Sequence, residues 1–539
     1  MTTRELPARI TGPAGEQGTG QATEPATEQA AEQAAEQATE QPGGQGSEPS
    51  TRVEAHGVDR IPDGERTASP REFLWIWHSA QFSFGTVVLG SVPVSFGLSW
   101  TASVTAILVG LLIGTAVFAP LVLFGKRTGA NDAVSSGAHF GVRGRVVANV
   151  ITIVVAIGFF SIAVWTGATA ILAAGQRVLG TPAGPGGLAV TMPLMALAVA
   201  VVAVYGYGAL LATYKVMTVI GGLVLLALVV VLLPGFDPGH AGGPYALGDF
   251  WRTWLLAVSF SATLPVSYST FQGDYSRYLS PRAGDRAAVA YTGAAMYVSN
   301  AIALIGGAYV TTMLMDASAP WILGVADVVP QWFAVVVIAF GFAGTLPQAA
   351  LCLYAAGLSA NSILWRLPRA AATWLVWAFG VATLYVGAIV FDAIESISTF
   401  VLILLVLVSP WTAIMLVGLA LRRARYHPDD LYGFARPGDR GRYWFTGGFN
   451  LRALGAFVPA VVLGLLFVDN TIYTGPFAGL AGGVDLSCLV PFCTAALLYA
   501  ALCRLFPERT ALVAAEDVTT ENATGDAMTA GYVTGGDPR

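Results

Sequence analysis

The sequence predicts an all-α integral membrane protein with twelve transmembrane helices. Of its 539 residues, 55% are hydrophobic and only 11% are charged, whereas a soluble protein usually carries about 25% charged residues. Long stretches contain no Asp, Glu, Lys or Arg, for example between Arg286 and Asp316 and between Asp327 and Arg366. Because about 20 apolar residues in a helix cross the roughly 30 Å hydrocarbon core, these stretches are long enough to span a bilayer.

The predicted spans form one membrane domain, residues 71–506, between two polar tails. Their approximate limits are 74–97, 101–124, 146–174, 188–206, 215–233, 251–272, 287–311, 332–361, 372–391, 397–421, 453–468 and 484–503. Residues 1–70 are predicted to be a disordered tail, since their low-complexity beginning has almost no large apolar residue that could form a core. Residues 507–539 are predicted to be a second polar tail.

The basic residues predict that both tails are cytoplasmic. If the N-terminus lies inside, the loops on that side carry 17 Lys or Arg residues, and the opposite loops carry only Arg177 and Arg252. Cytoplasmic loops of membrane proteins carry an excess of Lys and Arg. The asymmetry therefore supports an even number of spans and a multi-pass protein of the cell (plasma or inner) membrane.

Two spans are predicted to be interrupted helices. Span 1 contains the sequence FSFGTVVLGSVP, and span 6 contains Pro265 and ends in FQGDY. Gly and Pro are common in membrane helices in general, so one interrupted span alone has little meaning. Spans 1 and 6 are equivalent, however, if residues 74–233 and 251–421 are inverted repeats of five helices, with two extra helices within 453–503. Interruptions at matching positions mark the central site of many transporters.

The chemistry available inside the spans is mostly neutral. Away from their ends, the spans contain no Asp, Glu, Lys or Arg, and His78 is their one imidazole. Many membrane catalysts and proton relays depend on such groups, and the chain has no H-E-x-x-H or G-x-S-x-G motif. We therefore expect a protein that is not an enzyme and that holds no cofactor.

Aromatic, amide and hydroxyl side chains remain as candidate ligands for a solute. Trp165 and Thr169 lie four residues apart, hence on one face of span 3, while Gln81, Tyr268 and Gln348 lie in spans 1, 6 and 8. A flat, uncharged heterocycle can stack on the ring, and the amides and hydroxyls can bind its edge. The same residues also fit simpler roles, Trp165 in core or interfacial packing and the glutamines in hydrogen bonds between helices.

The segment FQGDYSRYLSP places an acid and a base at the predicted cytoplasmic end of span 6. Asp274 and Arg277 are three residues apart, and an exposed helical pair of this spacing contributes about 0.2–0.5 kcal/mol. Charges at such an end of a span need not be desolvated. One of the two is predicted to act as a latch that bonds neighbouring helix ends in one conformation, while the solute is expected one or two turns earlier, near Ser267 and Tyr268.

Several short motifs are distributed along most of the chain. They are HGVDRIPDGER before span 1, FGLSW at its end, GKRTGANDAVSSGAHFGVRG after span 2, GDYSRYLSP after span 6, LYAAGLSAN in span 8 and GGVDLS before span 12. Together they resemble the nucleobase:cation symporter-1 family, specifically its purine-cytosine permease branch. The resemblance implies a leucine-transporter-type fold and import of a nucleobase or related neutral heterocycle with a coupled cation by alternating access. It implies no nucleic-acid partner.

The resemblance also implies roles for individual residues. Trp165 would stack on the substrate ring, and Thr169 replaces an amide of the family. Gln81 stands where many members have Asn, Tyr268 stands where many have Trp, and Gln348 lies near an Asn of the family. The binding site would lie between spans 1, 3, 6 and 8.

The coupling ion is predicted to be H⁺ or Na⁺, with uniport as an alternative. A sodium site of this fold uses carbonyl groups of span 1 and hydroxyl groups of span 8, where Thr345 is well placed. A proton requires a titrating group, for which His78 is the inner candidate, although it also fits helix packing. Two other functions remain open, namely a transporter of the same fold for an amino acid or vitamin-like compound and a receptor or scaffold that transports nothing.

Overall fold

The computed structural model describes residues 54, 56–180, 184–314, 321–390, 393–435, 440–469 and 473–507. Within these residues the secondary structure is helical, and only isolated bridges such as the one between Ala68 and Leu279 pair backbone segments in β fashion. Residues 1–53 and 508–539, most of the two predicted tails, lie outside the described part. The prediction of an all-α protein is confirmed for the part that is described.

The first half of the membrane domain contains spans 1–5. Its elements are α2 (Glu72–Gln81), α3 (Phe84–Val87), η1 (Val88–Gly90) and α4 (Ser91–Ser95) in span 1, α5 (Trp100–Phe118), η2 (Ala119–Leu121) and α6 (Val122–Thr128) in span 2, and α9 (Arg145–Leu179), α10 (Pro185–Tyr205) and α11 (Tyr207–Leu232) in spans 3, 4 and 5. Two short helices, α7 (Asp132–Ser135) and α8 (Gly137–Phe140), connect α6 to α9.

The second half contains spans 6–12. Its elements are α12 (Phe250–Ser267), η4 (Tyr268–Phe271) and α13 (Gln272–Ser276) in span 6, α14 (Asp285–Thr311), α16 (Ala334–Ile363), α17 (Arg369–Tyr385) and α18 (Ala393–Leu421) in spans 7–10, and α19 (Leu451–Phe467) and α20 (Leu489–Leu505) in spans 11 and 12. A short helix, α15 (Trp321–Val328), lies between α14 and α16, and the 3-10 helix η7 (Pro428–Tyr432) follows α18.

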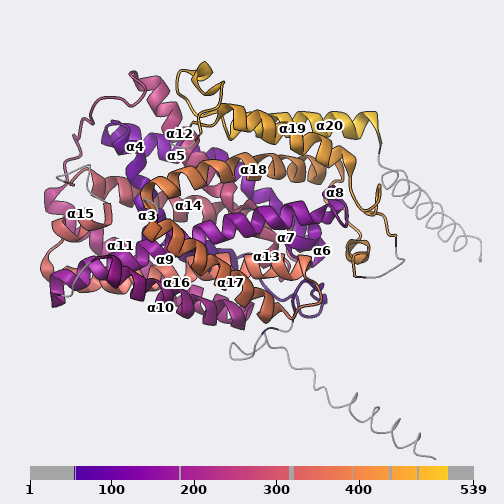
Figure 1. Ribbon diagram of the computed structural model, residues 1–539, viewed down its shortest axis with the longest axis horizontal. Coiled ribbons are helices and arrows are strands. Elements are labelled where there is room, and N and C mark those ends of the chain that lie inside the picture. Colours follow the sequence, from indigo (N-terminus) through magenta and orange to yellow (C-terminus); the bar gives the residue numbers. More distant parts are fainter. Residues whose placement is uncertain are drawn as a thin grey trace, which may run out of the picture. The chain divides into compact units, whose positions relative to one another are not determined.

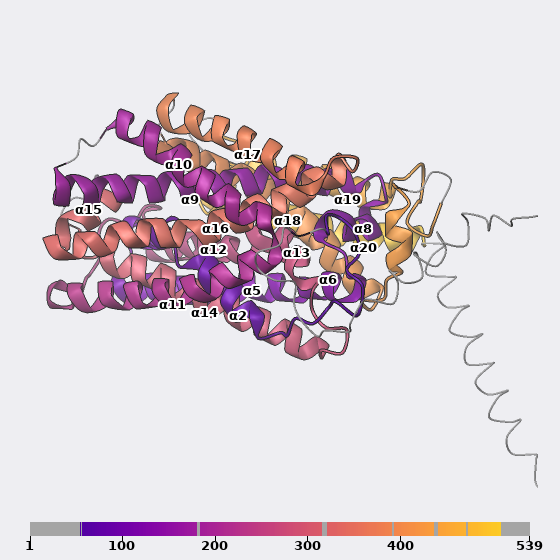
Figure 2. The ribbon, with the colours of Figure 1, turned by 90° about the horizontal axis from the view of Figure 1, so that it is seen from below.

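The long helices run side by side as a bundle. The α9 and α16 helices pack along each other, as do α12 and α5, so elements from both halves of the chain alternate through the core. Figure 1 shows α6, α7, α8 and α13 towards one end of this bundle and α15 at the other, and Figure 2 shows the same for α6, α8, α13 and α15. The two extra helices α19 and α20 lie against α18 at its edge.

Both predicted interruptions are present, and each has a local cause. In span 1, α2 ends at Gln81, and Ser83 takes an extended conformation in which its hydroxyl caps α3 by accepting a hydrogen bond from the Thr86 amide at 3.3 Å. Such a cap begins a new helix because it satisfies a free amide. In span 6, Pro265 has no amide proton to donate to the preceding turn, and α12 ends two residues later in the 3-10 turn of Tyr268–Phe271.

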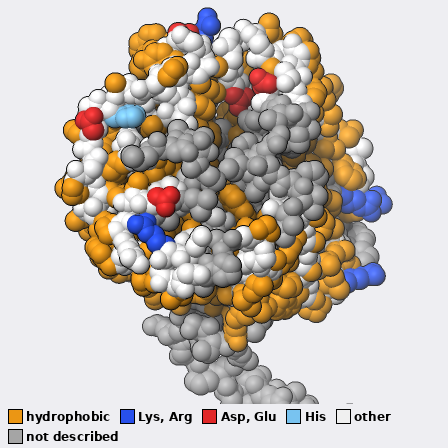
Figure 3. Space-filling view, turned by 60° about the vertical axis from the view of Figure 1, so that its left-hand side comes forward, with side chains coloured by type: hydrophobic (Ala, Val, Ile, Leu, Met, Phe, Trp, Pro, Cys, Tyr) orange, Lys and Arg blue, Asp and Glu red, His pale blue; other side chains and the backbone are white. Residues whose placement is uncertain are grey.

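The outer surface of the bundle is suited to lipid. Eight described helices are long and apolar enough to cross a membrane, and they correspond to predicted spans 2–5 and 7–10. The remaining predicted spans, 1, 6, 11 and 12, are interrupted or shorter apolar helices. Large apolar side chains such as Leu194 and Leu223 are more than 60% exposed, and apolar groups dominate the face in Figure 3. An apolar surface of this extent requires a membrane.

The predicted boundary of the first tail is wrong in one respect. Residue 54 and residues 56–70 are packed on the bundle, with Ile61 and Arg66 at most 4% exposed. The Ile61 amide donates to the carbonyl of Gly129 at 3.0 Å, and the Ala68 amide donates to the carbonyl of Tyr278 at 3.1 Å. The segment is therefore ordered by backbone hydrogen bonds to distant parts of the chain, which its own composition could not indicate.

Candidate functional site

A narrow cavity lies between the interruptions of spans 1 and 6. Its walls come from α2, α3, η1, α9, α12, η4, α16 and α18, and the lining residues are Gln81, Gly85, Thr86, Leu89, Phe159, Ile162, Phe260, Thr263, Leu264, Ser267, Tyr268, Gln348, Leu404 and Leu405. We call this the central cavity. The centres of water molecules can occupy about 20 Å³ of it, which is room for about one water. None of the residues that line it is charged.

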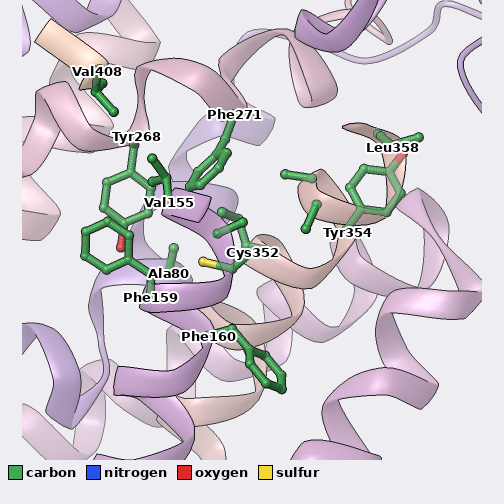
Figure 4. Close-up of a cluster of buried hydrophobic side chains, with 14 of the residues drawn as sticks. Ala80, Val155, Phe159, Phe160, Tyr268, Phe271, Cys352, Tyr354, Leu358 and Val408 are labelled. Carbon is green, nitrogen blue, oxygen red and sulfur yellow. The ribbon is translucent and has the colours of Figure 1, made fainter. Parts of the chain in front are cut away.

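Two aromatic rings form one wall of the central cavity. Phe159 on α9 and Tyr268 on η4 stack with their centroids 5.5 Å apart and an angle of 21° between the ring planes, as Figure 4 shows. Phe271 lies edge-on to Tyr268 on its other side, with centroids 5.8 Å apart. Rings in this arrangement offer a flat, apolar surface to a planar solute.

Hydrogen bonds join the neutral polar groups of the cavity to each other and to one of these rings. The Gln348 amide nitrogen donates to the Tyr268 hydroxyl at 3.2 Å, and its carbonyl oxygen accepts a hydrogen bond from Ser83. The Thr86 hydroxyl donates to the side-chain oxygen of Gln81 at 3.3 Å. These bonds link the break in span 1 to spans 6 and 8, so the predicted residues Gln81, Tyr268 and Gln348 do lie together, with Ser267 beside them.

Trp165 and Thr169 are not among the residues that line this cavity. Both are partly exposed, and the Thr169 hydroxyl donates to the Trp165 carbonyl at 2.8 Å. Trp165 follows Phe159 by six residues, so the two side chains point in directions about 120° apart around the helix axis. Phe159 carries no signal in the sequence beyond being an aromatic residue in the middle of a span, so its role depends on which face of α9 meets the two interrupted helices.

Comparison with known proteins identifies the family. The model of the family described as "Permease for cytosine/purines, uracil, thiamine, allantoin" matches residues 60–490. The chain belongs to this family. A curated relative, the putative purine-cytosine permease YxlA of Bacillus subtilis (strain 168), is 26% identical over 457 residues, which cover 83% of this chain and 95% of the relative.

Solved structures support the fold of this permease family member. The structure of Mhp1, a nucleobase-cation-symport-1 family transporter in a closed conformation with bromovinylhydantoin bound, has a TM-score of 0.66 at 18% identity and covers 84% of this chain and 96% of that one. A Na⁺-coupled sialic acid symporter has a TM-score of 0.55 at 12% identity and covers 83% and 92%. The predicted leucine-transporter-type fold is thereby confirmed.

The two predicted coupling residues of the permease lie outside the central cavity. The Thr345 hydroxyl donates to the Gly341 carbonyl at 2.6 Å and lies 3.3 Å from the Ala163 carbonyl. A methyl group at Gly344 would lie 2.7 Å from the Phe82 carbonyl oxygen, so the break in span 1 directly adjoins Thr345. His78 is half-buried, and its Nδ1 lies 2.8 Å from the Leu74 carbonyl of its own helix.

Arg277 is the centre of a buried hydrogen-bond network at the end of the bundle. Its guanidinium donates to the Glu54 carboxylate at 2.9 Å, to the Gly57 carbonyl at 2.7 Å and to the Tyr354 hydroxyl at 3.0 Å. Glu54 also accepts a hydrogen bond from the Tyr207 amide at 3.0 Å. The network thus joins the N-terminal segment, α11, the end of span 6 and α16.

The structure corrects the predicted surroundings of Asp274 and Arg277. The sequence predicts charges that meet water and can pair along one helical turn, but the two residues are 1% and 0% exposed. Arg277 pairs with Glu54, while a carboxylate oxygen of Asp274 accepts a hydrogen bond from the Asp132 amide at 3.3 Å. The segments that cover this end, residues 54 and 56–70 and α7, are rich in polar residues and give no indication in the sequence that they exclude water.

Proposed function

We propose that this protein is a secondary active transporter that imports a neutral heterocycle of the nucleobase type with a coupled cation. The observation that carries the proposal is the uncharged central cavity at the point where spans 1 and 6 are both interrupted. Central sites of transporters with inverted repeats lie at such interruptions. Membership of a permease family for cytosine, purines and related compounds agrees with this assignment.

The chemistry of the central cavity favours a planar, neutral solute. Phe159 and Tyr268 supply flat ring surfaces, while Gln81 and Gln348 supply amide groups that can both donate and accept hydrogen bonds. An amino acid or an amine would bring charges into a cavity whose lining residues carry none, and a buried charge without a partner is costly. We therefore favour the heterocycle over the zwitterionic or cationic solutes, and transport over a receptor or scaffold role.

Alternating access follows from the small size of the cavity. A heterocycle is larger than the single water for which there is room, so the walls must separate before the solute enters. We propose that Phe159 and Tyr268 move apart or turn so that the solute stacks against one of them. Mhp1 has been solved in a closed and in an inward-facing conformation.

The Arg277 network is our candidate for the latch. It ties span 6 to α16, α11 and the N-terminal segment, and these connections must be broken if the end of the bundle is to open. Separation would expose a charged pair that is at most 5% exposed in the present conformation. On the predicted topology this end faces the cytoplasm, so its opening would release the solute inward.

The coupling ion is proposed to be H⁺ or Na⁺. The Phe82 carbonyl at the break in span 1 contacts Gly344, the neighbour of Thr345 in the chain, so Phe82 and Thr345 are our candidates for oxygen ligands to Na⁺, since a hydroxyl that donates a proton still has lone pairs. His78 stays the candidate for a proton. The two ions are distinguished by measuring uptake with only a proton gradient and with only a sodium gradient.

Uptake into proteoliposomes tests the proposal. We would measure radiolabelled cytosine, adenine, hypoxanthine, uracil, allantoin and hydantoin under each gradient, with protein-free liposomes as the control. We expect gradient-dependent accumulation of at least one heterocycle and competition by its close analogues. Absence of both uptake and ligand-induced thermal stabilisation for all six compounds, with a correctly folded protein, would contradict the proposed function.

A further inference from the structure

Two carboxyl groups are buried against each other beside the Arg277 network. Asp132 begins α7 and is 3% exposed, and Asp274 lies in α13 and is 1% exposed. One oxygen of Asp132 accepts a hydrogen bond from the Gly273 amide at 2.5 Å, while the Asp132 amide donates to one oxygen of Asp274. A methyl group on Gly273 would lie 2.4 Å from an Asp132 oxygen, so α7 and α13 are in direct contact at this point.

The second oxygen of Asp274 has no hydrogen-bond donor in the structure as described. A buried carboxylate normally binds several donors or a base. An ionised Asp274 would therefore leave a negative charge on an oxygen with no partner, next to a second acid. A proton on the pair removes this charge, which is why we consider a proton to be the ligand of the site.

The bases around α7 are already occupied by other groups. Lys126 and Arg127 on α6 bind Asp285, Arg277 after α13 binds Glu54, and Arg145 on α9 donates to the Ser362 hydroxyl and stacks on Phe434. The elements that pack against α7 also carry Tyr275 on α13, Cys352 and Tyr354 on α16, His139 on α8, and Asp429, Asp430 and Tyr432 on η7. No ion pair joins a described base to Asp132 or Asp274. The Arg277 guanidinium attracts Asp274 electrostatically, but it forms its ion pair with Glu54.

We propose that the Asp132–Asp274 pair binds a proton while α7 and α13 are in contact and releases it when they separate, so that protonation holds this end of the bundle closed. The proposal rests on the alternating-access transport proposed above. It adds a proton-binding site that is separate from the central cavity and from Thr345 and His78. On the predicted topology, the proton is exchanged with the cytoplasm, and a more acidic cytoplasm slows opening.

The direction of the effect follows from linkage. Asp132 lies in the loop between two spans, and burial raises its pKa to about 7, although hydrogen bonds from Gly273 and Ser135 act in the opposite direction. Once solvated in the open form, an aspartate has a pKa of about 3.9. The proton therefore stabilises the closed form fully below pH of about 4, and this stabilisation is lost as the pH rises through about 7.

A distance measurement at controlled pH tests the proposal. Spin labels would be attached to Arg282→Cys, in the exposed loop after α13, and to Arg366→Cys, in the exposed loop after α16, in the full chain with Cys488, Cys493 and Cys503 changed to Ser. We expect the ratio of long to short distances to rise about tenfold between pH 6 and pH 8. Asp132→Asn mimics the protonated acid and should keep short distances at both pH values.

Controls separate a specific effect from unfolding and from failure of the proposed function. Asp285→Asn removes the nearby acid that binds Lys126 and Arg127. This variant should keep the pH dependence. Asp274→Asn should abolish it, which tests the same site if Asp132→Asn does not fold. A pH-independent ratio in the unmodified protein, or a full pH response in Asp132→Asn and Asp274→Asn, overturns the inference. A pH response without heterocycle transport would instead contradict only the proposed function.

Discussion

The central cavity and the charged end of the bundle, which comprises Glu54, Asp132, Asp274 and Arg277, are built from opposite chemistry. The cavity is lined by rings, aliphatic side chains, amides and hydroxyls. The charged end buries three acids and one base, all at most 6% exposed. Span 6 contributes to both, with Tyr268 in the cavity and Asp274 and Arg277 about two turns later.

This difference separates recognition from control of conformation. A neutral site can bind and release a neutral solute without paying for the dehydration of ions, so its contacts can be of moderate strength. Buried ions behave differently, because they are stable only while every partner is in place. Charges therefore suit the end that must be either fully closed or fully open, and neutral groups suit the site that must exchange its ligand.

The largest effect is expected from breaking the charged end. Arg277→Gln leaves the Glu54 carboxylate buried without its base, and removing one partner of a buried ion pair typically costs about 3–5 kcal/mol. We expect the closed conformation to be lost or strongly depopulated, with uptake reduced more than tenfold. Thermal unfolding and uptake would be measured together, and the affinity for the solute should change little in protein that remains folded.

A double substitution distinguishes charge from shape at this position. Glu54→Gln combined with Arg277→Gln removes both ions, so no charge remains buried alone. We expect the double variant to be more stable than Arg277→Gln, because the interaction energy of a coupled pair is not additive. If the double variant is as unstable as the sum of the two single variants, the pair does not act as a unit.

The second prediction concerns the neutral region. Phe159→Ala removes one face of the ring wall, and stacking of a base on an aromatic side chain is worth about 1–3 kcal/mol. We expect the dissociation constant for the transported heterocycle to increase between about fivefold and 150-fold. Trp165→Ala removes an aromatic ring of α9 that does not line the cavity; it is the matched control and should change the dissociation constant less than twofold. The reverse order of effects would restore Trp165 as the stacking residue.

These two regions also differ in how far they could be predicted from the sequence. Gln81, Ser267, Tyr268 and Gln348 were predicted site residues, and they line one cavity, because polar side chains in an apolar span avoid lipid and turn towards the interior of the bundle. Trp165 was predicted to stack on the substrate because it is a large aromatic residue in a span, but Phe159 is the aromatic residue of α9 that lines the cavity. Helical periodicity tells which residues share a face, but it does not tell which face meets the interrupted spans.

The charged end was predicted less well, for a physical reason. Asp274 and Arg277 were located correctly at the end of span 6, but a residue near a helix end is normally expected to meet water. Their burial depends on Glu54 and on α7, which are far away in the sequence and are themselves polar. Only the tertiary contacts among the N-terminal segment, α7 and α13 exclude the solvent.

A third prediction addresses the hydrogen bonds of the central cavity. Gln348→Leu removes the bonds to Tyr268 and Ser83, and each such bond contributes about 0.5–1.5 kcal/mol. We expect affinity to fall about two- to tenfold for each lost bond to the solute and the ranking of competing heterocycles to change. Competition uptake with the same panel measures both, and an unchanged ranking would mean that Gln348 only holds the helices together.

The smallest effect is expected from an ion pair that is accessible to water. Asp285 at the start of α14 is 34% exposed and binds Arg127, which is 45% exposed, and Lys126, which is 4% exposed, whereas both members of the Glu54–Arg277 pair are at most 5% exposed. Exposed pairs contribute about 0–1 kcal/mol because water solvates the separated charges nearly as well. Asp285→Asn should therefore lower the unfolding temperature only slightly and leave uptake within twofold. A loss as large as that of Arg277→Gln would show that burial is not what makes the charged end sensitive, since the two pairs differ mainly in their exposure to water.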